Sequence, residues 1–165
     1  MIEATIIDTP LGPLSLLARE GRCVGAGFSR DPGELYRHLH PSLRDPMTDV
    51  TDLGSVTAAV HRYFAGDVDA FDEVAVLQPS SPARERLWQA MRSVPAGATI
   101  SYGRLAQAAG LTTAGARAAG GACAANLVAP IVPCHRVVAA DGGLHHYGYG
   151  VAAKEWLLRH EGSML

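Results

Sequence analysis

The sequence lacks three features that would each indicate a class of protein. No stretch approaches the run of about 18 uncharged apolar residues that a helix needs to cross a bilayer, so we expect no membrane span. The start of the chain, MIEATIIDTPLG, has an acidic residue at Glu3 and no basic segment, so we expect no signal peptide. Cys23, Cys123 and Cys134 are odd in number and form no Cys-x-x-Cys pair, which favours a reducing compartment over a disulfide scaffold. We therefore predict a cytoplasmic protein.

Charge is nearly balanced overall but unevenly divided along the chain. The 165 residues carry 14 Lys and Arg against 16 Asp and Glu, a net charge of −2. Residues 1–78 have a net charge of −6, whereas residues 79–165 have a net charge of +4. A basic half is typical of a segment that meets an anionic partner, although small domains often differ by a few charges for no functional reason.

The first half predicts a small α/β domain. Its apolar runs, separated by turn residues, predict a three-stranded antiparallel meander followed by two helices. The expected strands are residues 4–8, 14–18 and 23–28, and the expected helices are 31–40 and 52–66. Asp31 is the expected N-cap of the first helix, with Pro32 at its first position, and Gly66 ends the second. Residues 74–77, VAVL, are strand-like, and QPSSP at 78–82 is the best candidate for a domain boundary.

The second half predicts mainly helix. The expected helices are residues 83–94, 100–110 and 111–126, with N-caps at Ser81, at Ser101 and at Thr112 or Thr113. The last two helices, joined by GLTT, have the form of a helix-turn-helix. We therefore predict the α/β (α+β) class. A small N-terminal antiparallel β-sheet domain with helices, residues 1–78, precedes a mainly helical C-terminal domain, residues 79–165, with a (winged) helix-turn-helix.

The third helix of this half carries almost no bulk. Between Ala114 and Ala125 only Arg117 and Cys123 are larger than alanine. Such a helix permits close approach of its backbone and offers few side chains that could read base edges. Two interpretations stay open: tight packing against a neighbouring helix, or contact with a phosphate backbone from which Arg117 projects.

The segment PIVPCHRVV, residues 130–138, sets a reactive pair among apolar residues. A thiol attacks carbon only as its thiolate and needs a neighbouring base, for which His135 is the candidate beside Cys134. Cysteines flanked by valines are also commonly inert core residues. A metal site would draw on Cys123, Cys134, His135, His145 and His146. Their spacing fits no familiar zinc pattern, so three interpretations of the cysteine remain at this point.

Several segments in order resemble those of the O6-alkylguanine-DNA alkyltransferases, also called methylated-DNA–protein-cysteine methyltransferases. IVPCHRVV matches the active-site signature (I/V)-P-C-H-R-(V/I), and VPAGATISYGRLA resembles the segment that leads into the helix-turn-helix. ARAAGGACAAN resembles the arginine-bearing recognition helix with its terminal asparagine, and GGLHHYGYGVAAKEWLLRHEG resembles the closing segment. The resemblance covers nearly all of residues 80–162.

The resemblance implies a single-use DNA repair reaction. The family flips an alkylated guanine out of the duplex, because the target atom is inaccessible in the stack, and moves its O6-alkyl group irreversibly onto a cysteine. Carried over, Cys134 is the acceptor, His135 its water-mediated base and Glu161 the acid that orients His135. Asn126 would hold the two halves of the site in register. Tyr102 would crowd the target phosphate and donate a proton towards the leaving guanine.

The resemblance also implies the partner and the walls of the site. Arg117 would fill the gap left by the extruded base. The expected DNA contacts are Tyr102, Arg117, Ala118, Gly121, Cys123 and Arg136, and the expected alkyl pocket is Tyr147, Gly148, Tyr149 and Lys154. The implied partner is double-stranded DNA containing alkylated guanine, bound through its minor groove by a monomer with little sequence specificity. No cofactor, metal or membrane is implied, and cooperative binding along DNA stays open.

Some positions depart from the family pattern. Leu127 stands where proline usually follows the asparagine, Tyr149 stands where the family has glycine, and His145-His146 precede Tyr147. Bulk in this loop favours transfer of methyl over large groups such as benzyl.

Two other functions remain open beside alkyl transfer. One is a non-catalytic alkyltransferase-like protein that only binds the lesion, although such proteins lack the reactive cysteine. The other is a cysteine hydrolase that would use Cys134, His135 and Glu161.

Overall fold

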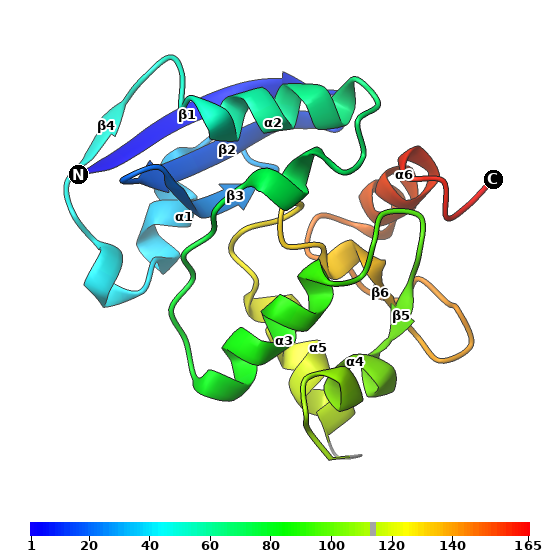
Figure 1. Cartoon of the computed structure of the whole chain (residues 1–165). Helices are drawn as coiled ribbons and strands as arrows, with labels where there is room; N and C mark the ends of the chain where they lie inside the picture. The colour runs from blue at the N-terminus through cyan, green and yellow to red at the C-terminus, as the bar shows by residue number, and fades with distance from the viewer. Residues whose placement is uncertain (113–114) are drawn as a thin grey trace. The chain divides into compact units, whose positions relative to one another are not determined.

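Two compact units make up the computed structural model, which describes residues 1–112 and 115–165 (Figure 1). The first unit comprises Met1–Pro79 and Leu127–Ile131, and the second comprises Ser80–Asn126 and Val132–Leu165. Strands and helices both occur, which confirms the predicted α/β class. The domain boundary after residue 78 stays a prediction.

The segment Leu127–Ile131 packs with the first unit through its backbone. The amide of Ala26 donates to the carbonyl of Leu127 at 2.8 Å, and the amide of Leu127 donates to Gln78 Oε1 at 2.7 Å. Proline, which has no amide hydrogen, could not make the second bond. Leucine at position 127, where the family that this chain resembles usually has proline, therefore supplies a backbone amide for this hydrogen bond.

The first unit is built on a four-stranded sheet in the order β3-β2-β1-β4. Its strands are β1 (Ile2–Thr9), β2 (Gly12–Arg19), β3 (Arg22–Gly27) and β4 (Met47–Asp49). The first three are consecutive antiparallel neighbours, so the predicted meander is confirmed. The short strand β4, which pairs in parallel with β1, was not predicted because three residues leave no periodic pattern. Residues 74–77 form only an isolated bridge, between Val76 and Cys23, and not the expected strand.

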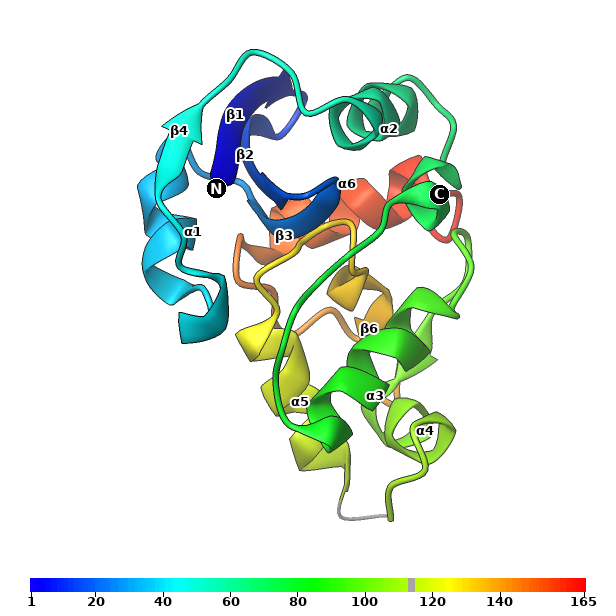
Figure 2. The same cartoon turned by 60° about the vertical axis from the view of Figure 1, so that its left-hand side comes forward.

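Helices cover both faces of this sheet. The first unit contains α1 (Pro32–His38), the 3-10 turns η1 (Pro41–Leu43) and η2 (Ala70–Glu73), and α2 (Ser55–Phe64). Figure 2 shows α1 and α2 on either side of the strands, and β2 is accordingly buried at every position from Leu14 to Ala18. Asp31 caps α1 as predicted, since its carboxylate accepts from the amide of Gly33 at 2.9 Å. Gly66 follows α2 with φ +118, the left-handed conformation expected after a helix end.

The second unit is mainly helical. It contains α3 (Pro82–Arg92), α4 (Tyr102–Ala108), α5 (Gly115–Ala125), the 3-10 turn η3 (Cys134–Arg136), α6 (Val151–His160) and the parallel strands β5 (Ile100–Ser101) and β6 (Val137–Val138). Ser81 and Ser101 are the N-caps predicted for α3 and α4, while the alternative cap Thr113 lies outside the described residues. Ile100 was predicted to begin the helix, but in the structure it belongs to the strand β5. No helix in the described part of the chain combines the length and apolar character of a membrane span.

Small residues let α5 approach its neighbours closely. Gly115, Ala119 and Ala122 form its buried face. At its start, a Cβ on Gly115 would lie only 2.8 Å from the Cβ of Ala106 in α4. Near its end, Trp88 Nε1 in α3 donates to the carbonyl of Ala122 at 2.9 Å. One face of the lean helix is therefore explained by tight helix packing.

Gly115→Ala should test this close approach. The added methyl group would meet Ala106 and, at 2.9 Å, the Cβ of Leu111, so we expect a loss of about 1–3 kcal/mol in the free energy of unfolding. Gly103→Ala in α4 is the matched control, because its added Cβ meets nothing within 4 Å and should stabilise the helix by about 0.5–1 kcal/mol. Urea unfolding of both variants makes the measurement. Equal stabilities would contradict the packing of α4 on α5.

Candidate active site

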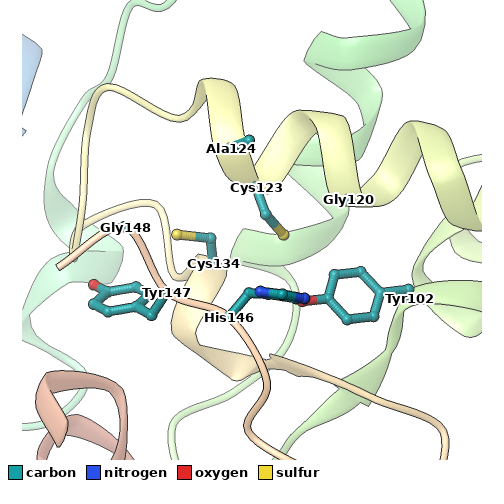
Figure 3. Close-up of a pocket in the computed structure, with 8 residues that line it drawn as sticks. All are labelled: Tyr102, Gly120, Cys123, Ala124, Cys134, His146, Tyr147 and Gly148. Carbon is teal, nitrogen blue, oxygen red and sulfur yellow. The ribbon is translucent and has the colours of Figure 1, made fainter. Parts of the chain in front are cut away.

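Cys134 lies in the wall of a pocket in the second unit (Figure 3). The pocket has a volume of about 470 Å³, in the range of small-molecule sites. Its lining comes from α4, α5, η3 and the loop before α6: Tyr102, Gly120, Cys123, Ala124, Cys134, His146, Tyr147 and Gly148. The structure thus brings five of the predicted site residues into one pocket, namely Tyr102, Cys123, Cys134, Tyr147 and Gly148.

The thiol of Cys134 is held in a nearly closed environment. Cys134 is only 7% exposed, and this burial raises the pKa of its thiol. The side-chain amide of Asn126 donates to the sulfur at 3.3 Å, and also to the carbonyl of Val132 at 2.9 Å. This hydrogen bond and the positive charge of Lys154 both favour the thiolate. The resting thiol is therefore protonated, with two groups in place to stabilise the anion.

His135 forms a buried pair with Glu161. Its Nε2 lies 2.8 Å from Glu161 Oε2, and both side chains are fully buried. Burial alone would raise the pKa of Glu161, but hydrogen bonds from His135 and Arg136, together with the guanidinium charge of Arg136, lower it to about 2, so the carboxylate is ionised at neutral pH. An ionised carboxylate only accepts, so Nε2 of His135 carries the hydrogen.

The same environment leaves the other ring nitrogen of His135 basic. Burial lowers the pKa of His135, although Glu161 opposes this, so the ring is neutral at neutral pH. Nδ1 is then a lone-pair acceptor. It is buried and has no hydrogen-bond partner among the described residues. A neutral imidazole oriented by a carboxylate, with one free acceptor nitrogen, is the arrangement of a general base.

Arg136 belongs to this buried cluster and not to the DNA contacts predicted from the sequence. Its side chain is 5% exposed. Nε and Nη2 donate to the two carboxylate oxygens of Glu161 at 2.8 and 3.1 Å, and Nη1 donates to the carbonyl of Val94 at 2.6 Å. A guanidinium that is occupied and enclosed in this way cannot reach a phosphate, so the expectation for Arg136 is corrected.

Lys154 was expected in the alkyl pocket, but it is a buried residue outside the pocket lining and connects two segments of the backbone. Its Nζ donates to the carbonyl of Val137, just after η3, at 2.7 Å and to the carbonyl of His146 at 3.0 Å. Burial lowers the pKa of Lys154, and the neighbouring thiols of Cys123 and Cys134 raise it. The side chain of Lys154 therefore connects the segment that follows Cys134 to the loop that walls the pocket.

Tyr149 is likewise not among the residues that line the pocket, in contrast to the prediction. Its ring meets Tyr147 edge-on, with centroids 5.8 Å apart, and Tyr147 in turn meets His135 with centroids 6.4 Å apart. Tyr147 thus lies in the wall, and Tyr149 contacts it from outside the lining. The bulk expected from Tyr149 does not narrow the pocket.

The outer face of α5 combines one charge with very small side chains. Arg117 and Ala118 are exposed, as are Ala124 and Ala125 at its end, and Gly121 is half-buried. Cys123, expected to touch DNA, lines the pocket instead. Burial raises the pKa of its thiol to about 12, so it stays protonated.

Three residues of the pocket lining were not predicted from the sequence, Gly120, Ala124 and His146, and His146 is the one of these with a polar side chain. It appeared only as an unusual loop residue and as part of a metal set. The cysteines and histidines of that proposed metal site do not come together, because His135 is hydrogen-bonded to Glu161 and His145 is exposed beside Asp141. Among the described residues no three His, Cys, Asp or Glu side chains are grouped to hold a metal ion. His146 and Tyr147 are consecutive residues and both line the pocket. An alternation of inward and outward side chains along the sequence is therefore absent here, and no local pattern could have predicted the place of His146.

Comparison with known proteins decides the family. Residues 82–163 match the family model described as 6-O-methylguanine DNA methyltransferase, DNA binding domain. The chain is 37% identical to a methylated-DNA–protein-cysteine methyltransferase of Salmonella typhimurium, across 96% of this chain and 95% of the relative. It is 36% identical to the human protein of the same name, across 99% and 82%. The chain belongs to the family of methylated-DNA–protein-cysteine methyltransferases.

The family predicted from the sequence is thereby confirmed. Among solved structures, Mycobacterium tuberculosis OGT in complex with DNA superposes with a TM-score of 0.83 at 32% identity, covering 98% of this chain and 93% of the other. A methyltransferase from the archaeon Pyrococcus kodakaraensis shares the fold, with a TM-score of 0.69 at 24% identity. The fold of the whole chain, and not only of its second unit, is therefore that of the family.

Glu161→Gln should destabilise the protein in a pH-dependent way. The folded-state pKa of Glu161 is about 2 against an ordinary value of 4.5, so its stabilisation is complete above about pH 4.5 and is lost as the pH falls towards 2. We expect the variant to lose about 3–5 kcal/mol at pH 7, because Arg136 is left buried and unpaired. Its stability should also change less between pH 4.5 and 2.

Glu155→Gln is the matched control for this experiment. Glu155 pairs with Arg159 on the exposed side of α6, where an ion pair contributes about 0.5 kcal/mol or less. Urea unfolding as a function of pH makes the comparison. If both variants behave alike, the buried cluster does not hold the charge that we assign to Glu161.

Proposed function

We propose that this chain repairs DNA by moving the O6-alkyl group of an alkylguanine, chiefly methyl, onto the sulfur of Cys134. DNA repair by alkyl transfer to cysteine follows from the family to which the chain belongs, and relatives are named for that reaction. The observation that carries the assignment to this residue is the pocket itself. It presents the buried thiol of Cys134, which accepts a hydrogen bond from Asn126 and is followed in the chain by the neutral His135.

The chemical step uses the groups around the thiol. Cys134 gives its proton through a water molecule to Nδ1 of His135, and Glu161 stabilises the imidazolium that forms. The hydrogen bond from Asn126 and the charge of Lys154 stabilise the thiolate. The sulfur then attacks the alkyl carbon, an S–C bond forms, the C–O6 bond breaks and O6 keeps the electron pair. The thioether has no route back to a thiol, so each molecule acts once.

The DNA partner fits the outer face of α5. A bulky recognition helix could not bring its backbone into a minor groove, whereas Ala118 and Ala124 leave it close to the surface. Arg117 is the one large side chain on this face and would occupy the space of the flipped base. The net charge of +4 on residues 79–165 attracts the phosphates without reading sequence. Because the acceptor must stay reduced, the reaction belongs in a reducing compartment such as the cytoplasm.

Intact mass after incubation with a duplex that contains O6-methylguanine tests the proposal. The protein should gain the mass of one CH2 unit, in a 1:1 ratio with repaired sites, and Cys134→Ser should gain none. Cys123→Ser is the matched control in the same pocket and should gain the same mass as the unsubstituted protein. Binding without a mass change would indicate the lesion-binding alternative, and repeated turnover on an ester would indicate a hydrolase.

Arg117→Ala should separate base flipping from chemistry. Without this side chain nothing replaces the extruded base, so we expect transfer from duplex DNA to slow by about 10-fold or more, as a stacking loss of about 1–3 kcal/mol requires. Transfer from the free base O6-methylguanine should be unchanged. Arg159→Ala, which removes an exposed arginine paired with Glu155 on α6, controls for charge. An equal effect of the two substitutions on duplex repair would argue against the role of Arg117.

A further inference from the structure

Gln78 provides a side-chain acceptor for the backbone just beyond α5. Its Oε1 accepts from the amide of Leu127 at 2.7 Å, and the carbonyl of Leu127 accepts from the amide of Ala26 in β3 at 2.8 Å. Both backbone polar groups of Leu127 are therefore held within the first unit. Gln78 is itself fixed beside β3, because the amide of the preceding Leu77 donates to the carbonyl of Cys23 at 3.0 Å.

The hydrogen bond from Leu127 to Gln78 restrains the backbone of Asn126. The amide hydrogen of Leu127 lies in the peptide plane that joins the two residues, and rotation about the ψ angle of Asn126 turns this plane. Holding that hydrogen on Gln78 therefore fixes the ψ angle of Asn126. From the other side, the amide of Asn126 donates to the carbonyl of Cys123 in the last turn of α5 at 3.3 Å. The backbone of Asn126 is thus held on both sides.

The side chain that this backbone carries contacts the thiol. Nδ2 of Asn126 donates to the sulfur of Cys134 at 3.3 Å and to the carbonyl of Val132 at 2.9 Å. Two hydrogen bonds from one amide nitrogen require that the Cβ of Asn126 stays in place, because hydrogen bonds weaken steeply with misalignment. Any freedom in the backbone of Asn126 would therefore weaken its contact with the sulfur.

Proline imposes the same restraint in the family to which the chain belongs. Leu127 stands at the position where proline usually follows the asparagine. A proline confines the residue before it to extended conformations by steric contact. Leucine lifts this restriction and adds an amide hydrogen, for which Gln78 is the acceptor. The hydrogen bond thus supplies the restraint that the ring of proline would supply.

We propose that Gln78 is a positioning residue for alkyl transfer, which holds Asn126 in the orientation that hydrogen-bonds the sulfur of Cys134. The inference rests on the proposed function, in which Cys134 is the acceptor. Gln78 acts through the peptide bond before Leu127 and not by contact with the substrate. Because the hydrogen bond from Asn126 favours the thiolate, loss of Gln78 should slow the transfer and raise the pKa of the thiol.

Gln78→Met tests the proposal, because methionine keeps the length of the side chain and removes the amide oxygen. Single-turnover methyl transfer from duplex DNA at neutral pH should slow by about 10-fold, the low end of what a hydrogen bond to a charged group contributes. Alkylation of Cys134 by iodoacetamide, followed by peptide mass spectrometry, should slow by a similar factor below the pKa of the thiol. Lys154, Cys123 and Tyr102 also interact with this thiol, but they are the same in every variant.

Two further substitutions show whether the effect passes through the backbone. Gln78→Glu keeps an acceptor oxygen and should recover most of the rate. Leu127→Pro, added to Gln78→Met, should also recover most of the rate, because proline restrains Asn126 without a hydrogen bond. A purely structural role for Gln78 would not be rescued by removing its partner.

Gln89→Met is the matched control. Gln89 is exposed on α3, so this substitution should leave both rates within about twofold of those of the unsubstituted protein. Gln78 is half-buried, so its variants should stay folded, and urea unfolding sets the conditions under which all of them are compared.

Three outcomes would overturn the role of Gln78. The first is a Gln78→Met protein with unchanged methyl transfer and thiol reactivity. The second is no recovery when Leu127→Pro is added. The third is equal slowing by Gln78→Met in an Asn126→Ala protein, because residues that act through one another are not additive. Failure of the proposed function looks different: the unsubstituted protein would then gain no methyl group, whereas iodoacetamide would still report the reactivity of Cys134.

Discussion

The rest of the candidate active site depends on the interactions of the buried Glu161 carboxylate with Arg136 and His135. It lies at the C-terminal end of α6, and Arg136 joins it to the carbonyl of Val94 just beyond α3. Because hydrogen bonds from His135 and Arg136 keep the carboxylate ionised, the hydrogen of His135 lies on Nε2 and Nδ1 is left as an acceptor. The three residues of η3 are thus positioned by the ends of two helices, which fixes the place of the thiol.

The small residues of α5 serve two requirements at once. On the inner face, Gly115 and Ala122 allow contact with α4 and α3 at distances that larger side chains would prevent. On the outer face, exposed alanines around Arg117 leave the backbone accessible, as the proposed DNA contact requires. Tight packing and DNA contact are therefore not alternatives for this helix. A substitution that enlarges one face need not disturb the other.

Most of the fold was predictable because its signals are local. The caps Asp31, Ser81 and Ser101 act within three residues of themselves, and the meander follows from the alternation of apolar runs and turns. The strand β4 and the bridge at Val76 were missed or misjudged because pairing with a distant strand, and not local pattern, decides them.

The sequence by itself determined the family, and it predicted Cys134 as the nucleophile together with candidate partners for it, because these are carried by residue types in a fixed order. Only the tertiary structure decided where the charged and aromatic side chains point. Arg136 points inward, because the buried and ionised carboxylate of Glu161 must be paired. Tyr149 lies outside the pocket lining and packs against Tyr147. His146 lines the pocket, and its backbone carbonyl is held by Lys154, eight residues further on. Such outcomes depend on contacts between distant segments, which no local pattern records.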